Sequence, residues 1–117
     1  MCFLTLLISM NKHKTNHIIL VYKKIKEVSQ KYFDSFDKII KSFSNDQESN
    51  EKEIDYIIKV ETAYYSLSDE GKLFINSEFF FNNYKGWWKG YYSKSQFFKL
   101  KKKYSLEFIR NLFAYVF

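Results

Sequence analysis

The chain has 117 residues, a formal charge of +6, one cysteine, no proline and only three glycines. A lone Cys2 cannot form an internal disulfide, so we expect a reduced, cytoplasmic setting. The shortage of turn residues excludes a β-sandwich and favours long helices in one domain.

The first nine residues are apolar, but no positive charge precedes them and no small-residue cleavage site follows. They are also far fewer than the roughly 20 residues that span a bilayer. We therefore expect a native start at Met10 or a packed chain end, and membrane anchoring is the less favoured interpretation. Residues 10–117 are predicted to form a single all-helical domain.

Three helices are predicted in the first two thirds of the chain. Residues 11–43 carry apolar side chains at the spacing of one helical face, namely Ile18, Ile19, Tyr22, Ile25, Val28, Tyr32, Phe36, Ile39, Ile40 and Phe43. Residues 44–50 are polar and indicate a loop. The inner side of the second helix is marked by Ile54, Ile57, Ile58, Tyr64 and Tyr65.

A third helix is expected to start after Ser68. Its hydroxyl can cap free backbone N–H groups, and Asp69 and Glu70 stand where the helix dipole favours acids. This helix carries Leu73, Phe74, Ile75 and Phe79. Residues 82–90 then form a break.

That break contains two glycines and two tryptophans. Gly86 and Gly90 permit tight or left-handed backbone, and Trp87 and Trp88 can bury large areas against the helices. We favour the core for at least one tryptophan. The alternative, stacking on bases, would suit single-stranded nucleic acid.

The last helix is predicted to begin at Lys94, because Ser93 and Gln96 have the spacing of a capping box. Its inner face carries Phe97, Leu100, Tyr104 and Phe108, and its outer face carries Ser95, Gln96, Lys99, Lys102 and Lys103. Lys101 falls nearer the apolar side, where we expect it to extend its ammonium to the rim. Residues 106–117 are apolar nearly all round, so this half should pack on the first helix or on a second copy in a homodimer.

Charge is segregated along the sequence. Residues 82–117 carry a formal charge of +7, whereas residues 1–81 carry −1. The chain is rich in Lys, Asn, Ile, Phe and Tyr, and a codon bias that produced this composition would distribute lysine along the whole chain. The local excess therefore predicts a polyanion or an anionic membrane surface as partner, against the alternative of a merely solvated face.

The sequence Leu67-Ser-Asp-Glu, a helix, a short linker and then Tyr92-Ser-Lys-Ser-Gln-Phe-Phe-Lys-Leu100 resembles the helix-turn-helix of sigma-factor region 4. It is more similar still to phage late-transcription regulators of the ArpU type. A family of small mycoplasma proteins has a similar ending, with paired tryptophans before the Tyr-Ser-Lys-Ser element. The resemblance covers about residues 67–112 and implies a small helical bundle with a C-terminal helix-turn-helix.

The resemblance also implies roles for individual residues. Ser93 would cap the recognition helix, and Phe97 and Leu100 would hold it to its neighbours. The major groove would be faced by Lys94, Ser95, Gln96 and Lys99. Tyr92, Lys102 and Lys103 would lie toward phosphates. Gln can recognise adenine and Lys guanine, although Lys lacks the bidentate geometry of Arg.

Nothing in the sequence favours an enzyme, a cofactor or a metal site. His13 and His17 share a helical face without the acid of a metalloprotease motif, and the glycines do not form a phosphate loop. We therefore expect a sequence-directed DNA-binding protein, as a transcriptional regulator or sigma-like accessory that contacts duplex DNA and RNA polymerase. The alternatives are a protein-interaction module that docks through the apolar C-terminal helix, a single-strand binder, or a membrane-surface protein.

Overall fold

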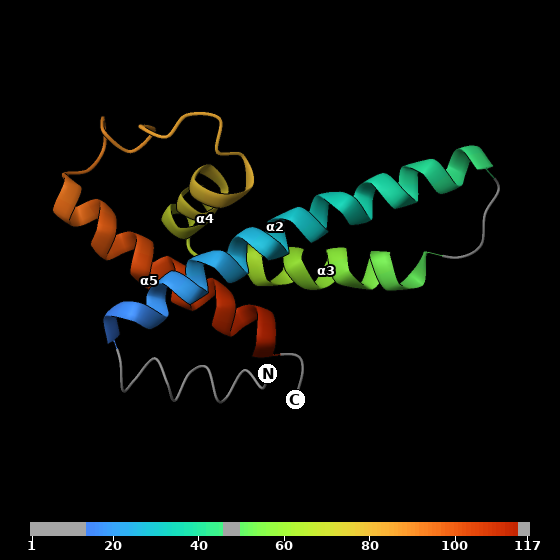
Figure 1. Ribbon diagram of the computed structural model, residues 1–117, viewed down its shortest axis with the longest axis horizontal. Helices are drawn as coiled ribbons and strands as arrows, with labels where there is room; N and C mark the ends of the chain where they lie inside the picture. The colour runs from blue at the N-terminus through green and yellow to red at the C-terminus, as the bar shows by residue number, and fades with distance from the viewer. Residues whose placement is uncertain (1–13, 46–49, 115–117) are drawn as a thin grey trace.

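The computed structural model describes residues 14–45 and 50–114. Within these ranges the chain forms four α-helices, one π-helical turn and no strand, which confirms the all-α prediction. The elements are α2 (Lys14–Asn45), α3 (Glu51–Tyr65), α4 (Asp69–Ile75), η1 (Asn76–Phe80) and α5 (Lys94–Phe113). Figure 1 shows α2 and α3 running antiparallel, with α5 crossing them at the end where α2 begins.

The core lies where α2, α3, α4 and α5 meet. From α2 it takes Val21, Ile25 and Val28, which are spaced four and three residues apart on one helical face. Val21 was absent from the predicted apolar face. The second half of α2 extends beyond this core together with the start of α3 (Figure 1), and there Ile40 and Phe43 are 60% and 81% exposed. In this part of the described chain only α2 and α3 pack against each other, and a pair of helices cannot bury every apolar side chain that the helical spacing predicts to face inward.

The predicted inner side of α3 is partly wrong. The buried residues of this helix are Ile57, Val60 and Ala63. Three residues predicted to face inward, Ile54, Ile58 and Tyr65, are exposed, as is Leu73 of α4. The buried face repeats every three residues through Val60 and fully buried Ala63, and both were absent from the predicted inner side.

The start of α4 follows the prediction. The backbone N–H of Gly71 donates to Ser68 Oγ over 3.1 Å, so Ser68 caps the helix. After seven residues the helix widens into η1, where the N–H of Phe81 donates to the carbonyl of Asn76 over 2.7 Å. Such π-helical turns are rare and often accompany functional sites.

The apolar second half of α5 is covered within its own chain. Phe108, Ile109 and Leu112 are buried, and α5 packs on both α2 and α3. Asn111 Nδ2 of α5 donates to the carbonyl oxygen of Ala63 in α3 over 3.2 Å, and this hydrogen bond connects the two helices. The predicted packing on the first helix is therefore confirmed.

Some sequence-based predictions fall outside the described residues. They concern the extension at residues 1–9, the side chain of His13, most of the loop at residues 44–50 and the last three residues. Within the described ranges, no helix combines the length and the hydropathy needed to cross a membrane.

Candidate nucleic-acid interface

The start of α5 is fixed by a reciprocal pair of hydrogen bonds. The backbone N–H of Gln96 donates to Ser93 Oγ over 3.2 Å, and the N–H of Ser93 donates to Gln96 Oε1 over 3.0 Å. This is the capping box that the sequence predicts, and it satisfies two N–H groups that the helix leaves free.

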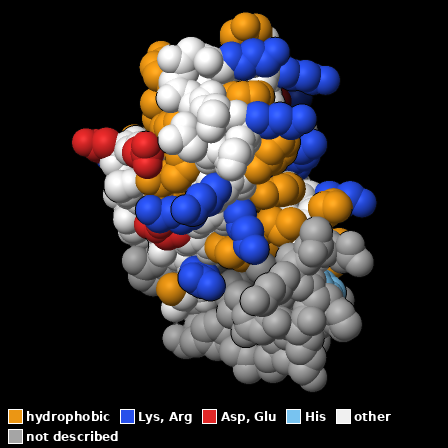
Figure 2. All heavy atoms as spheres, turned by 90° about the vertical axis from the view of Figure 1, so that its left-hand side faces the viewer, with side chains coloured by type: hydrophobic (Ala, Val, Ile, Leu, Met, Phe, Trp, Pro, Cys, Tyr) orange, Lys and Arg blue, Asp and Glu red, His pale blue; other side chains and the backbone are white. Residues whose placement is uncertain are grey.

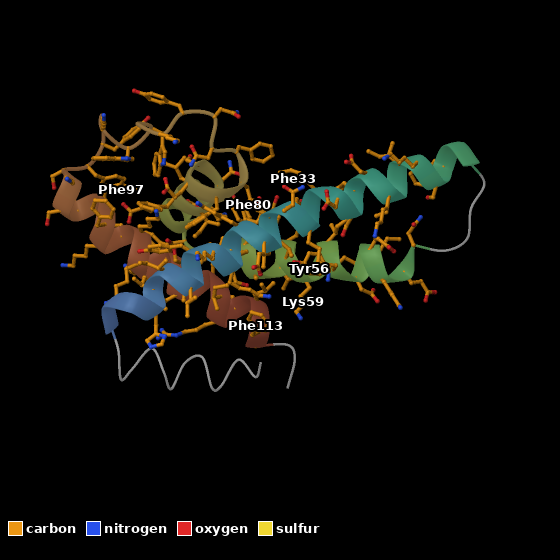
Figure 3. The ribbon with its side chains drawn as sticks, viewed as in Figure 1. Phe33, Tyr56, Lys59, Phe80, Phe97 and Phe113 are labelled. Atoms are coloured by element: carbon orange, nitrogen blue, oxygen red, sulfur yellow. The ribbon has the colours of Figure 1, made fainter. Side chains whose placement is uncertain are left out.

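An aromatic layer anchors the first turn of α5. Phe97 is buried, and its ring is stacked on Trp88 at a centroid distance of 4.4 Å and on Phe74 at 5.4 Å. Trp87 meets the ring of Phe74 edge to face at 5.1 Å. Figure 3 places Phe97 near the start of α5, facing the segment between η1 and α5. Both tryptophans are half-buried in this layer, as expected for core anchors.

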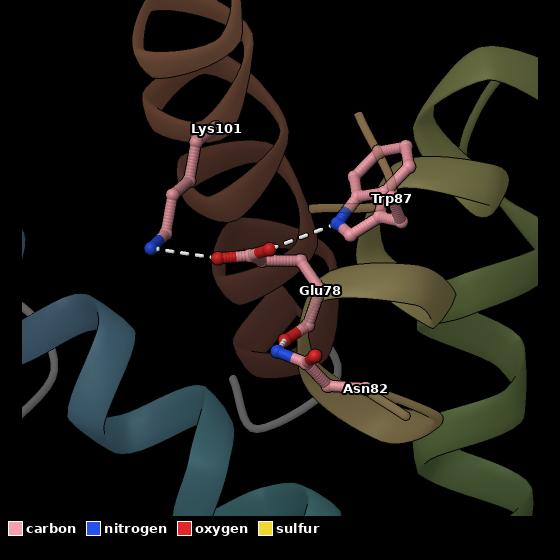
Figure 4. A network of polar contacts seen from close by, with 4 residues as sticks. All are labelled: Glu78, Asn82, Trp87 and Lys101. Carbon is pink, nitrogen blue, oxygen red and sulfur yellow. Dashed lines mark hydrogen bonds and ion pairs between the residues drawn. The ribbon is translucent and has the colours of Figure 1, made fainter. Parts of the chain in front are cut away.

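A largely buried ion pair holds the middle of α5 against η1. Lys101 Nζ lies 2.9 Å from Glu78 Oε2, and the two side chains are only 17% and 12% exposed. Trp87 Nε1 donates to the other carboxylate oxygen over 3.0 Å (Figure 4), and the ammonium lies 4.5 Å from the ring centroid of Tyr22. Lys101 therefore does not extend to the rim, because Glu78 supplies an acid close to the core.

A second carboxylate lies between α4 and α5. Glu70 accepts hydrogen bonds from the hydroxyls of Tyr104 and Tyr92, the latter over 3.0 Å. These two hydrogen bonds hold the pKa of Glu70 below its usual value, and the charge of Lys103 acts in the same direction. The pKa values of both tyrosines are raised, first by burial and then by the hydrogen bond to Glu70. Tyr104 thus bridges the two helices at neutral pH.

The opposite side of α5 is exposed and basic. We call it the lysine face and define it by Ser95, Lys99, Lys102, Lys103 and Arg110, all of them exposed. Each residue advances about 100° around a helix, so these five fall on one side. Figure 2, which views the end of the molecule where α5 begins, shows basic side chains spread over that end with hydrophobic side chains between them. The single acid of α5, Glu107, is half-buried.

The predicted site residues divide into two groups. Lys94, Ser95, Lys99, Lys102 and Lys103 are exposed with no hydrogen bond or ion pair among the described residues. By helical spacing Lys94 points about 140° away from Lys99, so the two do not share a face. Lys103 Nζ lies 5.1 Å from the ring centroid of Tyr104, and its charge contributes to the lowered pKa of Glu70.

Two predicted contact residues have other partners. Gln96 uses its side-chain oxygen for the capping box, and the Tyr92 hydroxyl donates to Glu70 beside a negative charge. Neither group is therefore free to bind a base or a phosphate without first breaking these bonds. The sequence motif suggested both a cap and a base contact for Gln96, and the structure places its oxygen in the cap.

Arg110 belongs to the lysine face but was not among the predicted contact residues. It follows Lys99 by eleven positions, or about three helical turns, which places both on the same side of the helix. Its spacing from Lys99 could have identified it. Two further lysines, Lys85 and Lys89, are exposed in the segment before α5.

The linker between the two helices of the expected motif is not short. Thirteen residues, 81–93, separate η1 from α5, whereas a helix-turn-helix uses a turn of about three or four residues. The extra length lets Trp87 and Trp88 fold back on Phe74 and Phe97. None of the three glycines has a left-handed φ, so Gly86 and Gly90 serve a turn without that conformation.

No protein-family model, no curated protein and no solved structure shows significant similarity to this chain. In the described part of the chain, no three His, Cys, Asp or Glu side chains come together as a metal site would require.

Proposed function

We propose that this chain is a DNA-binding protein that holds duplex DNA with the lysine face of α5. The observation that carries this proposal is the division of α5 into two sides. One side is locked to the bundle by Phe97, Lys101 and Tyr104, and the other presents three lysines and an arginine to solvent. A rigid helix with an exposed cationic face is suited to the phosphates that line a groove.

The chemistry of the face favours contacts with phosphates over contacts with bases. Lysine offers a point charge rather than the planar fork that pairs with guanine, and Gln96 is engaged in the cap. Ser95 and Lys99 remain the side chains best placed for base edges. We therefore propose a cytoplasmic regulator or sigma-like accessory with modest sequence preference, whose affinity falls steeply with salt.

The test is binding of the purified full chain to random duplex DNA and to single-stranded DNA over a salt series. Tight duplex binding whose logarithm falls linearly with the logarithm of the salt concentration would support the proposal. Preference for the single strand would instead indicate base stacking on aromatic side chains. Absence of binding at low salt would overturn the proposal.

A second candidate is docking on a protein partner such as RNA polymerase. It is favoured by the exposed aromatic side chains Tyr84, Tyr91 and Phe98 in the same part of the chain. The apolar half of α5, where the sequence predicted such docking, buries Phe108, Ile109 and Leu112 within the chain. This candidate would be favoured if purified polymerase binds the wild-type protein but not Phe98→Ser, and if the wild-type protein does not bind duplex DNA.

A further inference from the structure

A pocket of about 180 Å³ lies between α2, α3 and η1, away from the lysine face. No residue of α5 lines it. Its walls are mainly aromatic with a single carboxylate, and they include Tyr32, Glu61, Tyr64, Tyr65, Phe80 and Phe81. Val60, which is buried in the core, also lines it. The π-helical turn η1 carries Phe80, which Figure 3 shows beside α2.

The rings around the pocket stand nearly at right angles to one another. Tyr32 and Phe80 lie 5.7 Å apart between centroids at an interplanar angle of 78°, and Tyr64 and Tyr65 lie 5.2 Å apart at 84°. Rings in different planes form the walls of a cage rather than one stacked layer. Tyr65 and Phe81 are 68% and 57% exposed, so the cage is open to solvent.

The carboxylate of Glu61 is held in a fixed position at this cage. The hydroxyl of Tyr32 donates to Glu61 Oε2 over 2.7 Å. Burial raises the pKa of Tyr32 above its usual value, and the hydrogen bond to Glu61 raises it further, so the hydroxyl keeps its proton. Among the described residues, no Lys, Arg or His lies within ion-pair distance of Glu61. A half-buried negative charge therefore faces the pocket region without a cationic partner.

A cation already lies against one of these rings from outside the pocket. Lys72 Nζ is 5.7 Å from the ring centroid of Tyr65. Lys72 does not line the pocket, and Asp69 holds its ammonium at 3.2 Å. The contact shows that a tyrosine of this cluster can accept an ammonium group on its face.

We propose that this pocket binds an organic ammonium group, with the charge beside Glu61 and the attached carbon atoms against the aromatic rings. Aromatic cages recognise such cations through the negative potential of the ring faces, and a carboxylate adds direct charge attraction. Bare Ca²⁺ or Mg²⁺ would need several oxygen ligands, which this aromatic lining does not supply. The ammonium belongs either to a free small molecule or to the lysine side chain of a protein partner.

The experiment is an NMR titration of the full chain at constant ionic strength with two matched pairs of probes. Choline is compared with 3,3-dimethylbutan-1-ol, which has the same shape without the charge. A blocked Gly-Lys-Gly tripeptide is compared with its version acetylated at the lysine amine. We expect at least one cation to shift the resonances of Tyr65 and Phe81, with its neutral counterpart binding about tenfold more weakly. Choline alone would identify a small-molecule source, and the peptide alone would identify a protein source.

Two variants test the assignment of the site. Glu61→Gln removes the charge but keeps an oxygen that can accept from Tyr32, so the fold should persist while cation binding falls about tenfold. Tyr65→Ala changes an exposed side chain and should also weaken binding. Glu53→Gln, in the same helix but outside this pocket, is the matched control and should bind as the wild type does. Binding in Glu61→Gln equal to that of the wild type, or no preference for cations over neutral analogues, would overturn the proposal. DNA binding is measured separately; the two Glu→Gln variants change the net charge equally, so their DNA affinities should agree with each other.

Discussion

Gly71 and Tyr104 are in direct contact between α4 and α5. A Cβ atom on Gly71 would lie 2.8 Å from Cδ1 of the Tyr104 ring and 3.3 Å from the Cβ of Leu67. The same tyrosine donates its hydroxyl proton to Glu70, the residue before the glycine. The absence of a side chain at Gly71 therefore allows the close approach that places the Tyr104 hydroxyl at Glu70.

Gly71→Ala should destabilise the protein by about 1–3 kcal/mol, because the added methyl group overpacks the interface and displaces the Tyr104 ring. This net value already includes the higher helix propensity of alanine, worth about 1 kcal/mol in the opposite direction. The measurement is the free energy of unfolding from urea denaturation. Gly90→Ala is the matched control, since a methyl group there would meet no atom within 4 Å and the φ of Gly90 is not left-handed. Equal stability of the two variants would contradict the assigned contact.

Breaking the ion pair between Lys101 and Glu78 should also destabilise the fold. Lys101→Met leaves a largely buried carboxylate without its cation and should cost about 3 kcal/mol in the free energy of unfolding. Adding Glu78→Gln to the same chain should recover most of that loss, because no uncompensated charge then remains. Lys102→Met, on the exposed side, should change stability by less than about 0.5 kcal/mol. A Lys101→Met protein as stable as Lys102→Met would show that the pair does not hold α5.

A substitution at Ser105 should have the opposite effect and stabilise the fold. The residue is fully buried, and its hydroxyl finds no hydrogen-bond partner in the part of the chain that the structure describes. Ser105→Ala removes an unsatisfied polar group at little cost in packing, so we expect a gain of about 1 kcal/mol. Thermal and urea unfolding measure it, with Ser95→Ala as an exposed control. A loss of stability in Ser105→Ala would mean that the hydroxyl is hydrogen-bonded in solution.

Glu70 should make stability depend on acid pH. Its pKa is lowered in the folded protein by the hydroxyls of Tyr104 and Tyr92, so its carboxylate stabilises the fold above the usual carboxyl pKa of about 4. That contribution is lost as the pH falls through the lowered pKa. Glu70→Gln should therefore be less stable than the wild type at pH 7, and the difference should shrink at pH 3. A stability difference between Glu70→Gln and the wild type that is the same at pH 3 and at pH 7 would contradict the assigned hydrogen bonds.

Local features of the fold could be predicted from the sequence. The caps at Ser68 and Ser93 depend on residues within three positions, so their sequence signatures were sufficient. The outward direction of Lys99 and Lys102 follows from helical spacing once the start of α5 is known.

Features that depend on distant residues could not be predicted in this way. Glu78 and Lys101 are separated by 23 positions and meet only because the tryptophan segment folds back between their helices. The exposure of Ile40 and Phe43 depends on where the bundle ends, and helical periodicity does not contain that information. The aromatic pocket at Glu61 likewise needs three elements in place, including a π-helical turn that has no sequence signature.

The lysine face makes the sharpest prediction about function. Lys102→Gln should weaken binding to every duplex sequence and lower the slope of log affinity against log salt by about one unit. Lys103→Gln should do the same to a smaller extent, because the Lys103 ammonium also attracts Glu70 and lies against the Tyr104 ring. Lys99→Gln should in addition change sequence preference, since Lys99 lies nearest the start of the helix among the cations of this face.

The matched controls for these variants are Lys23→Gln and Lys26→Gln, which change the net charge equally on the exposed side of α2. Fluorescence anisotropy between about 50 and 200 mM salt measures all of them, with circular dichroism to confirm that each variant is folded. Smaller effects on α2 than on α5 would locate the contact on the lysine face, because long-range attraction depends on net charge whereas phosphate contacts depend on position. Equal effects at both places would mean that the protein attracts DNA only through its overall charge, and the proposed interface would be wrong.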